Sequence, residues 1–131
     1  MNDPVSGPGT APQALVVDDD TVQQTYFEMC LTRMGYGVTL AGDGMAALSA
    51  CRDRNFDLVI CDIRMPRLNG INFIQNVKRM SPNAAKKIIV ISSMDDKNVH
   101  KQAMDAGAAA MLVKPVSVQR LTETIQSLAG V

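Results

Sequence analysis

The stretch ALVVDDDTV, residues 14–22, runs from four apolar residues directly into three aspartates. A short apolar run of Ala, Leu and Val is typical of a buried β-strand. Three carboxylates at the end of a strand repel one another, and two like charges roughly 4 Å apart cost about 4 kcal/mol at an effective dielectric constant of about 20. The stretch therefore indicates a core strand that ends in a site where concentrated negative charge has a use.

The pattern of a short apolar run followed by an amphipathic stretch recurs along the chain. It predicts strands at 14–17, 37–41, 57–61, 87–92 and 108–113, and helices at 22–34, 45–52, 71–80, 95–107 and 118–128. The strands lack clean alternation of apolar and polar residues, which favours a parallel sheet covered by helices on both faces. We expect an α/β fold of the (βα)5 type, a doubly wound, flavodoxin-like sheet of five parallel strands.

Composition favours one globular domain, because the chain has 131 residues, 47% of them hydrophobic and 20% charged. We expect a flexible tail at 1–12 and the domain at 13–131. The 13 basic and 13 acidic residues balance, which argues against nucleic-acid or membrane-surface binding. No apolar stretch is long enough to span a membrane. Three scattered cysteines without a CxxC pair predict reduced thiols and a cytoplasmic location.

Polar side chains follow four of the five predicted strands. Right-handed crossovers bring the carboxyl ends of parallel strands to one edge of the sheet, where ligands bind in such folds. The residues expected at this edge are Asp18, Asp19 and Asp20, then Asp62, then Ser92 and Ser93, and finally Lys114. Asp20 precedes Thr21 and is interpreted as a helix cap. The other acids predict a Mg²⁺ site, because Mg²⁺ takes oxygen ligands and keeps several waters.

The segment DLVICDIRMPRLNG, residues 57–70, carries a further pattern: a strand ending in Asp62, then Met65-Pro66, then Gly70 at the start of a helix. The acid pair Asp18-Asp19 precedes it, and Ser92 and Lys114-Pro115 follow it on later strand ends. With these motifs in this order, the sequence resembles the receiver domain of two-component response regulators, including the stand-alone chemotaxis type. The resemblance covers about residues 14–128.

The resemblance implies that Asp62 accepts a phosphoryl group from a phosphohistidine on a histidine kinase or a phosphotransfer protein. It implies that Asp19, Asp62 and the backbone carbonyl of Arg64 ligate Mg²⁺, and that Asp18 acts mostly through a bound water. A metal that bridges the acceptor and the phosphoryl oxygens neutralises developing charge. Such a domain is a signalling module rather than an enzyme, since it catalyses only its own phosphorylation and dephosphorylation.

Two further roles follow from the resemblance. Ser92 would hydrogen-bond the phosphoryl oxygens, and Lys114 would pair with one of them, which suits lysine as a point charge. The bond between Lys114 and Pro115 would be cis. Phosphoryl transfer asks a protein mainly for positioning and charge stabilisation, which these residue types supply.

The output is expected to be binding to another protein, or service as a phosphorelay intermediate or sink. The sequence ends soon after the last predicted helix, so we expect no DNA-binding or enzymatic output domain. The expected surface for a downstream target is the face made by the fourth helix, the fifth strand and the fifth helix. One departure from the family pattern concerns the switch that reads out phosphorylation. Met111 stands where this family usually has Tyr or Phe, and Arg64 and Met94 occupy the variable positions near the phosphate.

Two alternatives remain at this point. A small phosphatase of the haloacid-dehalogenase type would use Asp18 as nucleophile with Asp20 two residues later, and would take Ser92 and Lys114 in the right order. It lacks a later acidic pair and leaves Asp62 without a role. A receiver-like scaffold that is never phosphorylated is the other alternative, against which the complete set of five polar residues argues.

Overall fold

The computed structural model describes residues 11–64, 69–80, 84–93 and 97–128. Strands and helices alternate along the chain: β1 (Gln13–Val17), α1 (Thr21–Arg33), β2 (Gly37–Ala41), α2 (Gly44–Asp53), β3 (Leu58–Asp62), α3 (Gly70–Met80), β4 (Ile88–Ser92), α4 (Lys97–Ala106), β5 (Ala110–Val113) and α5 (Val118–Leu128). Of the tail expected at 1–12, residues 1–10 lie outside the described part. None of the described helices combines the length and the apolar character needed to cross a bilayer.

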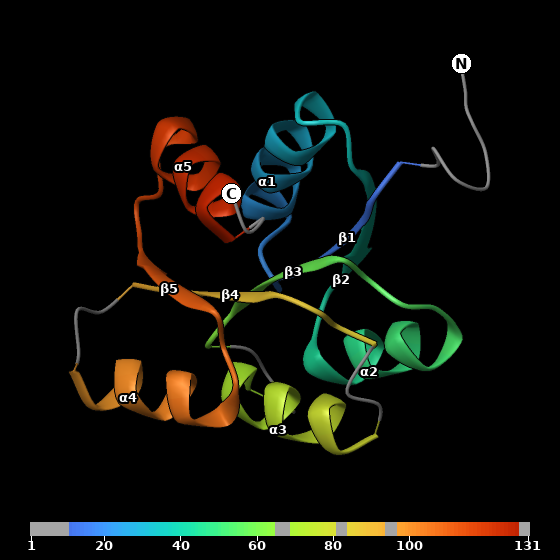
Figure 1. Cartoon of the computed structure of the whole chain (residues 1–131), viewed down its shortest axis with the longest axis vertical. Helices are drawn as coiled ribbons and strands as arrows, with labels where there is room; N and C mark the ends of the chain where they lie inside the picture. The colour runs from blue at the N-terminus through green and yellow to red at the C-terminus, as the bar shows by residue number, and fades with distance from the viewer. Residues whose placement is uncertain (1–10, 65–68, 81–83, 94–96, 129–131) are drawn as a thin grey trace.

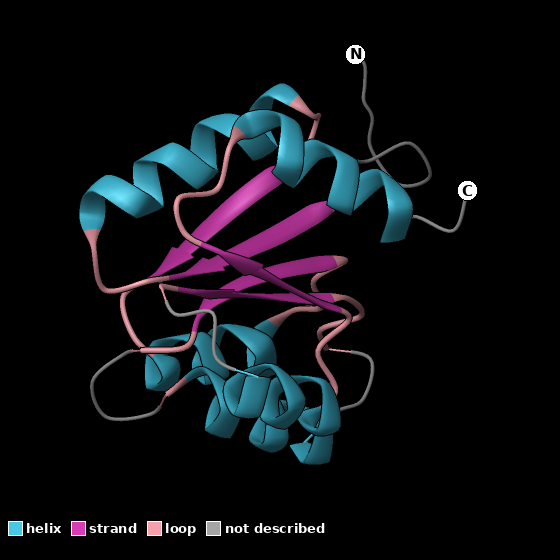
Figure 2. Ribbon diagram, turned by 90° about the vertical axis from the view of Figure 1, so that its left-hand side faces the viewer, coloured by secondary structure: helices cyan, strands magenta, loops and turns pink. Residues whose placement is uncertain are grey.

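The five strands form one parallel sheet in the order β2-β1-β3-β4-β5. Helices α1 and α5 cover one face, and α2, α3 and α4 cover the other (Figure 1). The same three layers are visible from the side in Figure 2. The predicted doubly wound (βα)5 fold is therefore confirmed.

Each strand contributes side chains to both layers of the core, because successive residues of a strand point to opposite faces. In β1, Leu15 and Val17 pack with α2 and α3, whereas Ala14 and Val16 pack with α1 and α5. All five residues of β3 and all five of β4 are buried. Burial on both faces explains why the central strands read as continuous apolar runs.

Local signals in the sequence explain where α1 begins and ends. The carboxylate of Asp20 accepts hydrogen bonds from the backbone N–H groups of Val22 and Gln23, so Asp20 is the N-cap, as predicted. Met34 is the C-cap, and Gly35 follows with φ = 95°. Glycine adopts this left-handed conformation without the steric cost of a β-carbon.

Two local expectations differ from the structure, and a third falls partly outside the described residues. Val22, expected on the buried face of α1, is 73% exposed. Five residues of α-helix rotate roughly 140°, which separates Val22 from the fully packed Phe27. The helix predicted at 95–107 is described from Lys97 to Ala106, and residues 95–96 lie outside the described part. The strand predicted from residue 108 starts at Ala110, although the N–H of Ala109 already donates to the carbonyl of Ile88 at 2.8 Å.

Candidate functional site

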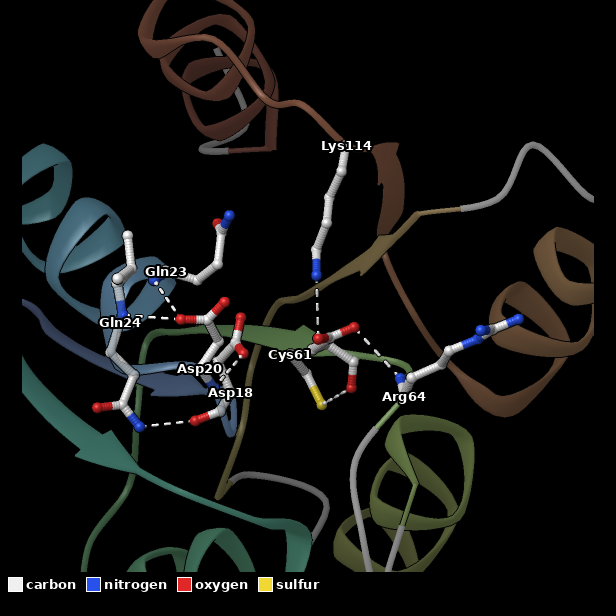
Figure 3. Close-up of polar contacts among 9 residues, drawn as sticks. Asp18, Asp20, Gln23, Gln24, Cys61, Arg64 and Lys114 are labelled. Atoms are coloured by element: carbon white, nitrogen blue, oxygen red, sulfur yellow. Dashed lines mark hydrogen bonds and ion pairs between the residues drawn. The ribbon is translucent and has the colours of Figure 1, made fainter.

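The first part of the site is the acidic turn that follows β1. The N–H of Asp18 donates to the carbonyl of Ala41 at 3.0 Å, so Asp18 continues the pairing of β1 with β2. Its Oδ1 accepts from the N–H of Asp20 at 2.9 Å, and its carbonyl accepts from Nε2 of Gln24 at 2.6 Å (Figure 3). Asp18 is 1% exposed, whereas Asp19 is exposed. The fold thus holds one carboxylate inside and leaves its neighbour at the surface.

Asp62 ends β3 and lies between an amide and an ammonium group. Its Oδ1 accepts from the backbone N–H of Arg64 at 3.2 Å, and its Oδ2 lies 3.1 Å from Nζ of Lys114 (Figure 3). Lys114 follows β5, and its own N–H donates to the carbonyl of Ser92 at 2.7 Å. Both oxygens of this buried carboxylate are therefore oriented by neighbours.

The carboxylates of Asp18, Asp19 and Asp62 form one cluster. One oxygen from each of them lies within 4.8 Å of the others. An all-oxygen donor set of this kind matches the preference of a hard cation such as Mg²⁺. The single ammonium of Lys114 offsets only part of the negative charge, so the residues present fit a divalent cation.

The environment of Asp18 makes its negative charge energetically costly. Burial raises the pKa of the Asp18 carboxyl above its ordinary value, and the nearby Asp62 and Asp19 carboxylates act in the same direction. The hydrogen bond from the N–H of Asp20 and the charge of Lys114 lower it. The net effect is a raised pKa of Asp18, as expected for a carboxylate that is buried beside like charges.

The backbone around Asp62 is held by close packing. The N–H of Gly70 donates to the carbonyl of Ile63 at 2.9 Å. A β-carbon at Gly70 would lie 2.7 Å from the carbonyl oxygen of Asp62, so only glycine permits this approach of α3 to the end of β3. The thiol of Cys61 donates to the same carbonyl at 3.4 Å, and burial raises its pKa. Cys61 is therefore a protonated core residue and not a ligand.

The structure brings together most of the predicted site residues. Ser92 ends β4 and is 5% exposed, and the parallel register places Asp62 opposite its neighbour Ile91. The bond between Lys114 and Pro115 is cis, as the resemblance implies. Met65, Pro66 and Met94 lie outside the described residues. Gln24, which holds the carbonyl of Asp18, was missed, because a glutamine on a helix carries no signal of such a contact.

Comparison with known proteins gives the chain a family. The model of the response regulator receiver domain matches residues 14–126. The transcriptional regulatory protein ZraR of Salmonella typhimurium is 38% identical over 112 residues, which are 86% of this chain and 25% of ZraR. The chemotaxis protein CheY of Thermotoga maritima is 33% identical, over 89% of this chain and 97% of CheY. The chain therefore spans about a quarter of ZraR but nearly all of CheY.

Solved structures agree with these matches. The receiver domain of the sensor histidine kinase PA1611 from Pseudomonas aeruginosa, with a magnesium ion in its active site cleft, aligns with a TM-score of 0.83 at 26% identity, over 92% of this chain and 99% of that one. A chain of the CheX–CheY–BeF₃–Mg complex from Borrelia burgdorferi aligns with a TM-score of 0.86 at 26% identity, over 93% and 92%.

The phosphatase alternative is not supported. The family match covers most of the chain and belongs to receiver domains. The carboxylate of Asp20, which the alternative needs beside Asp18, is engaged in capping α1. Asp62, which the alternative leaves without a role, lies at the centre of the site.

Proposed function

The chain belongs to the response regulator receiver domain family, and on this premise we propose that Asp62 accepts a phosphoryl group from a histidine kinase or a histidine phosphotransfer protein. The observation that carries the proposal is the position of the Asp62 carboxylate. It is buried, it lies beside Asp18 and Asp19, and its Oδ2 lies 3.1 Å from the ammonium of Lys114. A phosphoacceptor needs this combination of a fixed nucleophilic oxygen and nearby positive charge.

The chain's own residues supply positioning and electrostatics. In the transfer, an oxygen of Asp62 forms a bond to phosphorus as the bond from phosphorus to the donor's histidine nitrogen breaks. The ammonium of Lys114, which contacts Oδ2 of Asp62, then pairs with a phosphoryl oxygen. Ser92, at the end of the adjacent strand β4, contributes its hydroxyl to the same group. Fixed donors and charges aimed at the transferring group are the main means of catalysis in phosphoryl transfer.

The acidic cluster would hold Mg²⁺ during the reaction. Asp19, Asp62 and the carbonyl of Arg64 would be direct ligands, and Asp18 would act mostly through a bound water. When bound, the cation would neutralise negative charge that develops during phosphoryl transfer. The close approach of the three carboxylates, with one oxygen of each within 4.8 Å of the others, supports a divalent cation here.

We place the output at a protein-binding face made by α4, β5 and α5. Three of its apolar side chains, those of Met104, Val113 and Val118, are 38%, 39% and 50% exposed. The phosphorylated form would bind a downstream target there, or pass its phosphoryl group on as a relay intermediate or sink. We place the protein in the cytoplasm, where its three buried free thiols would stay reduced. It catalyses only its own phosphorylation and dephosphorylation.

The experiment is incubation with Mg²⁺ and acetyl phosphate, followed by mass spectrometry to locate the phosphate. We expect one phosphoryl group on Asp62, none in Asp62→Asn, and normal labelling in the control Asp53→Asn, which changes an exposed aspartate at the end of α2. Circular dichroism checks that the variants fold. An unlabelled wild-type protein would overturn the proposal, as would label that remains on Asp18 in the Asp62→Asn variant.

A further inference from the structure

Tyr26 connects helix α1, which follows the acidic turn, with the segment between β5 and α5, which follows Lys114. It lies on α1, and its hydroxyl donates to the carbonyl of Val116 at 2.6 Å. Val116 is 8% exposed and lies between β5 and α5, two residues after Lys114. Burial raises the pKa of the Tyr26 hydroxyl, so the group remains a protonated donor. The contact therefore ties the middle of α1 to the segment that carries Lys114.

Within the sheet, the acidic turn and this segment are connected only through two intervening strands. β1 and β5 are not neighbours, because β3 and β4 lie between them. α1 starts directly after the acidic turn and is anchored to it at Asp20 and Gln24. Since α1 and α5 cover the same face of the sheet (Figure 1), the bond from Tyr26 to Val116 links the acids to the lysine segment by a second route.

Hydrogen bonds hold the segment from Lys114 to Ser117 at its start, in its middle and at its end. At its start, the N–H of Lys114 donates to the carbonyl of Ser92. At its end, Oγ of Ser117 accepts from the N–H of Arg120 at 3.0 Å and begins α5. Between these two points, the carbonyl of Val116 is held by Tyr26. Loss of the middle hydrogen bond would let the backbone next to Lys114 sample other positions.

We propose that Tyr26 is a positioning residue for phosphoryl transfer: by holding the carbonyl of Val116, it keeps the ammonium of Lys114 directed at Asp62. The inference rests on the function proposed above. It adds a residue that lies outside the acidic cluster of Asp18, Asp19 and the acceptor Asp62. The proposed effect of Tyr26 on the rate of phosphorylation runs through Lys114, so this effect must disappear when Lys114 is absent.

The test replaces the hydroxyl and keeps the ring. Tyr26→Phe is compared with Tyr36→Phe, which removes the other tyrosine hydroxyl of the chain, at the opposite edge of the sheet beside Asp57. The rate of phosphorylation by acetyl phosphate is measured at saturating Mg²⁺, and the Kd for Mg²⁺ is measured by amide NMR shifts. We expect Tyr26→Phe to slow phosphorylation about two- to tenfold, the range that corresponds to one hydrogen bond. Its Mg²⁺ affinity should stay unchanged, and Tyr36→Phe should match the wild type in both.

The decisive comparison repeats Tyr26→Phe in a Lys114→Ala background. There the hydroxyl should have no further effect on the rate, because the group that it positions is gone. An equal slowing in both backgrounds would show a general structural role and overturn the inference, and so would an unchanged rate in Tyr26→Phe alone. If the wild-type protein is not labelled on Asp62 at all, the proposed function fails first, which distinguishes the two failures.

Discussion

Lys114 and Asp62 are 52 positions apart in the chain, yet Nζ of the lysine lies 3.1 Å from Oδ2 of the aspartate. Their side chains are 24% and 7% exposed, so the pair is largely removed from solvent. Asp62 also faces two other carboxylates. The lysine is therefore the counter-charge of an acidic cluster in the metal-free state, and this has consequences for stability as well as for phosphoryl transfer.

Lys114→Gln should destabilise the metal-free protein by about 1–3 kcal/mol. Removing one partner of a buried ion pair costs about 3–5 kcal/mol, and the partial exposure of Lys114 reduces this. Urea denaturation with EDTA measures the change. The matched control is Lys101→Gln, which removes an exposed pair with Asp105 on α4 and should change stability by at most about 0.5 kcal/mol.

Adding Asp62→Asn to Lys114→Gln should restore much of the lost stability, since the carboxylate that lacked a partner is then neutral. Additive losses in the double variant would show that the two side chains do not interact in solution.

Asp18→Asn should make the metal-free protein more stable at neutral pH. The folded pKa of Asp18 lies above its unfolded value, mainly because of burial, so the folded state binds this proton more tightly. The stability that this proton supplies is complete below the unfolded pKa and is lost as pH rises through the folded pKa. The stability of Asp18→Asn should therefore exceed that of the wild type as pH rises, and the difference should vanish in acid.

Thermal unfolding in EDTA across a pH series measures this advantage. Asp19→Asn is the matched variant, and it should gain less because Asp19 is exposed. With saturating Mg²⁺ the wild-type protein should become more stable than either variant, because the intact acidic cluster then gains the free energy of Mg²⁺ binding. A larger gain in Asp19→Asn, or a gain that persists in acid, would contradict this account.

Gly70→Ala should destabilise the protein by about 1–3 kcal/mol and slow its phosphorylation. The added β-carbon would meet backbone atoms, the carbonyl oxygen of Asp62 at 2.7 Å and Cα of Ile63 at 2.9 Å. Backbone must move to make room, as in an overpacked core, and that movement displaces the acceptor.

Gly42→Ala is the control for this substitution, because a β-carbon at Gly42 meets nothing within 4 Å. Chemical denaturation and the acetyl phosphate assay give the two readouts. A Gly70→Ala variant with wild-type stability and rate would show that α3 can shift without disturbing Asp62.

Met111 should weaken the response of the distant face to phosphorylation. It is half-buried on β5 and packs against the core under α3 and α4, and it has no hydroxyl with which to hydrogen-bond a shifted loop. A modification shifts a two-state equilibrium only by its differential interaction with the two states, and the missing hydrogen bond is worth about 1 kcal/mol.

Amide NMR of the free protein and of its Mg²⁺–beryllofluoride complex tests this, with beryllofluoride standing in for the phosphoryl group. Shifts should be large near Asp62, Ser92 and Lys114, and smaller near Met104 and Leu121. In Met111→Tyr the shifts of that second group should grow. Large cooperative shifts there in the wild type would refute the prediction.

Local signals in the sequence predict the local structure of this chain correctly. The apolar runs predict the strands, Asp20 predicts the cap of α1, and Gly70 predicts the start of α3, each from residues close together in the chain. Residue spacing in the sequence predicts less accurately which side chains of a helix are buried. Val22 matches the four-residue spacing of Tyr26 and Cys30 but is exposed, because that spacing drifts around a helix of 3.6 residues per turn.

The sequence by itself determined the order of strands and helices and the chemistry at the carboxyl end of each strand, because both are written in short stretches. Tertiary structure alone decided that Asp18 is buried while Asp19 is exposed, and that Tyr26 holds the carbonyl of Val116 across 90 positions. Adjacent aspartates have the same local pattern, and only the packing of β2 and α1 around β1 distinguishes them. Contacts between distant segments depend on how the helices pack on the sheet, and no short stretch of sequence specifies that packing.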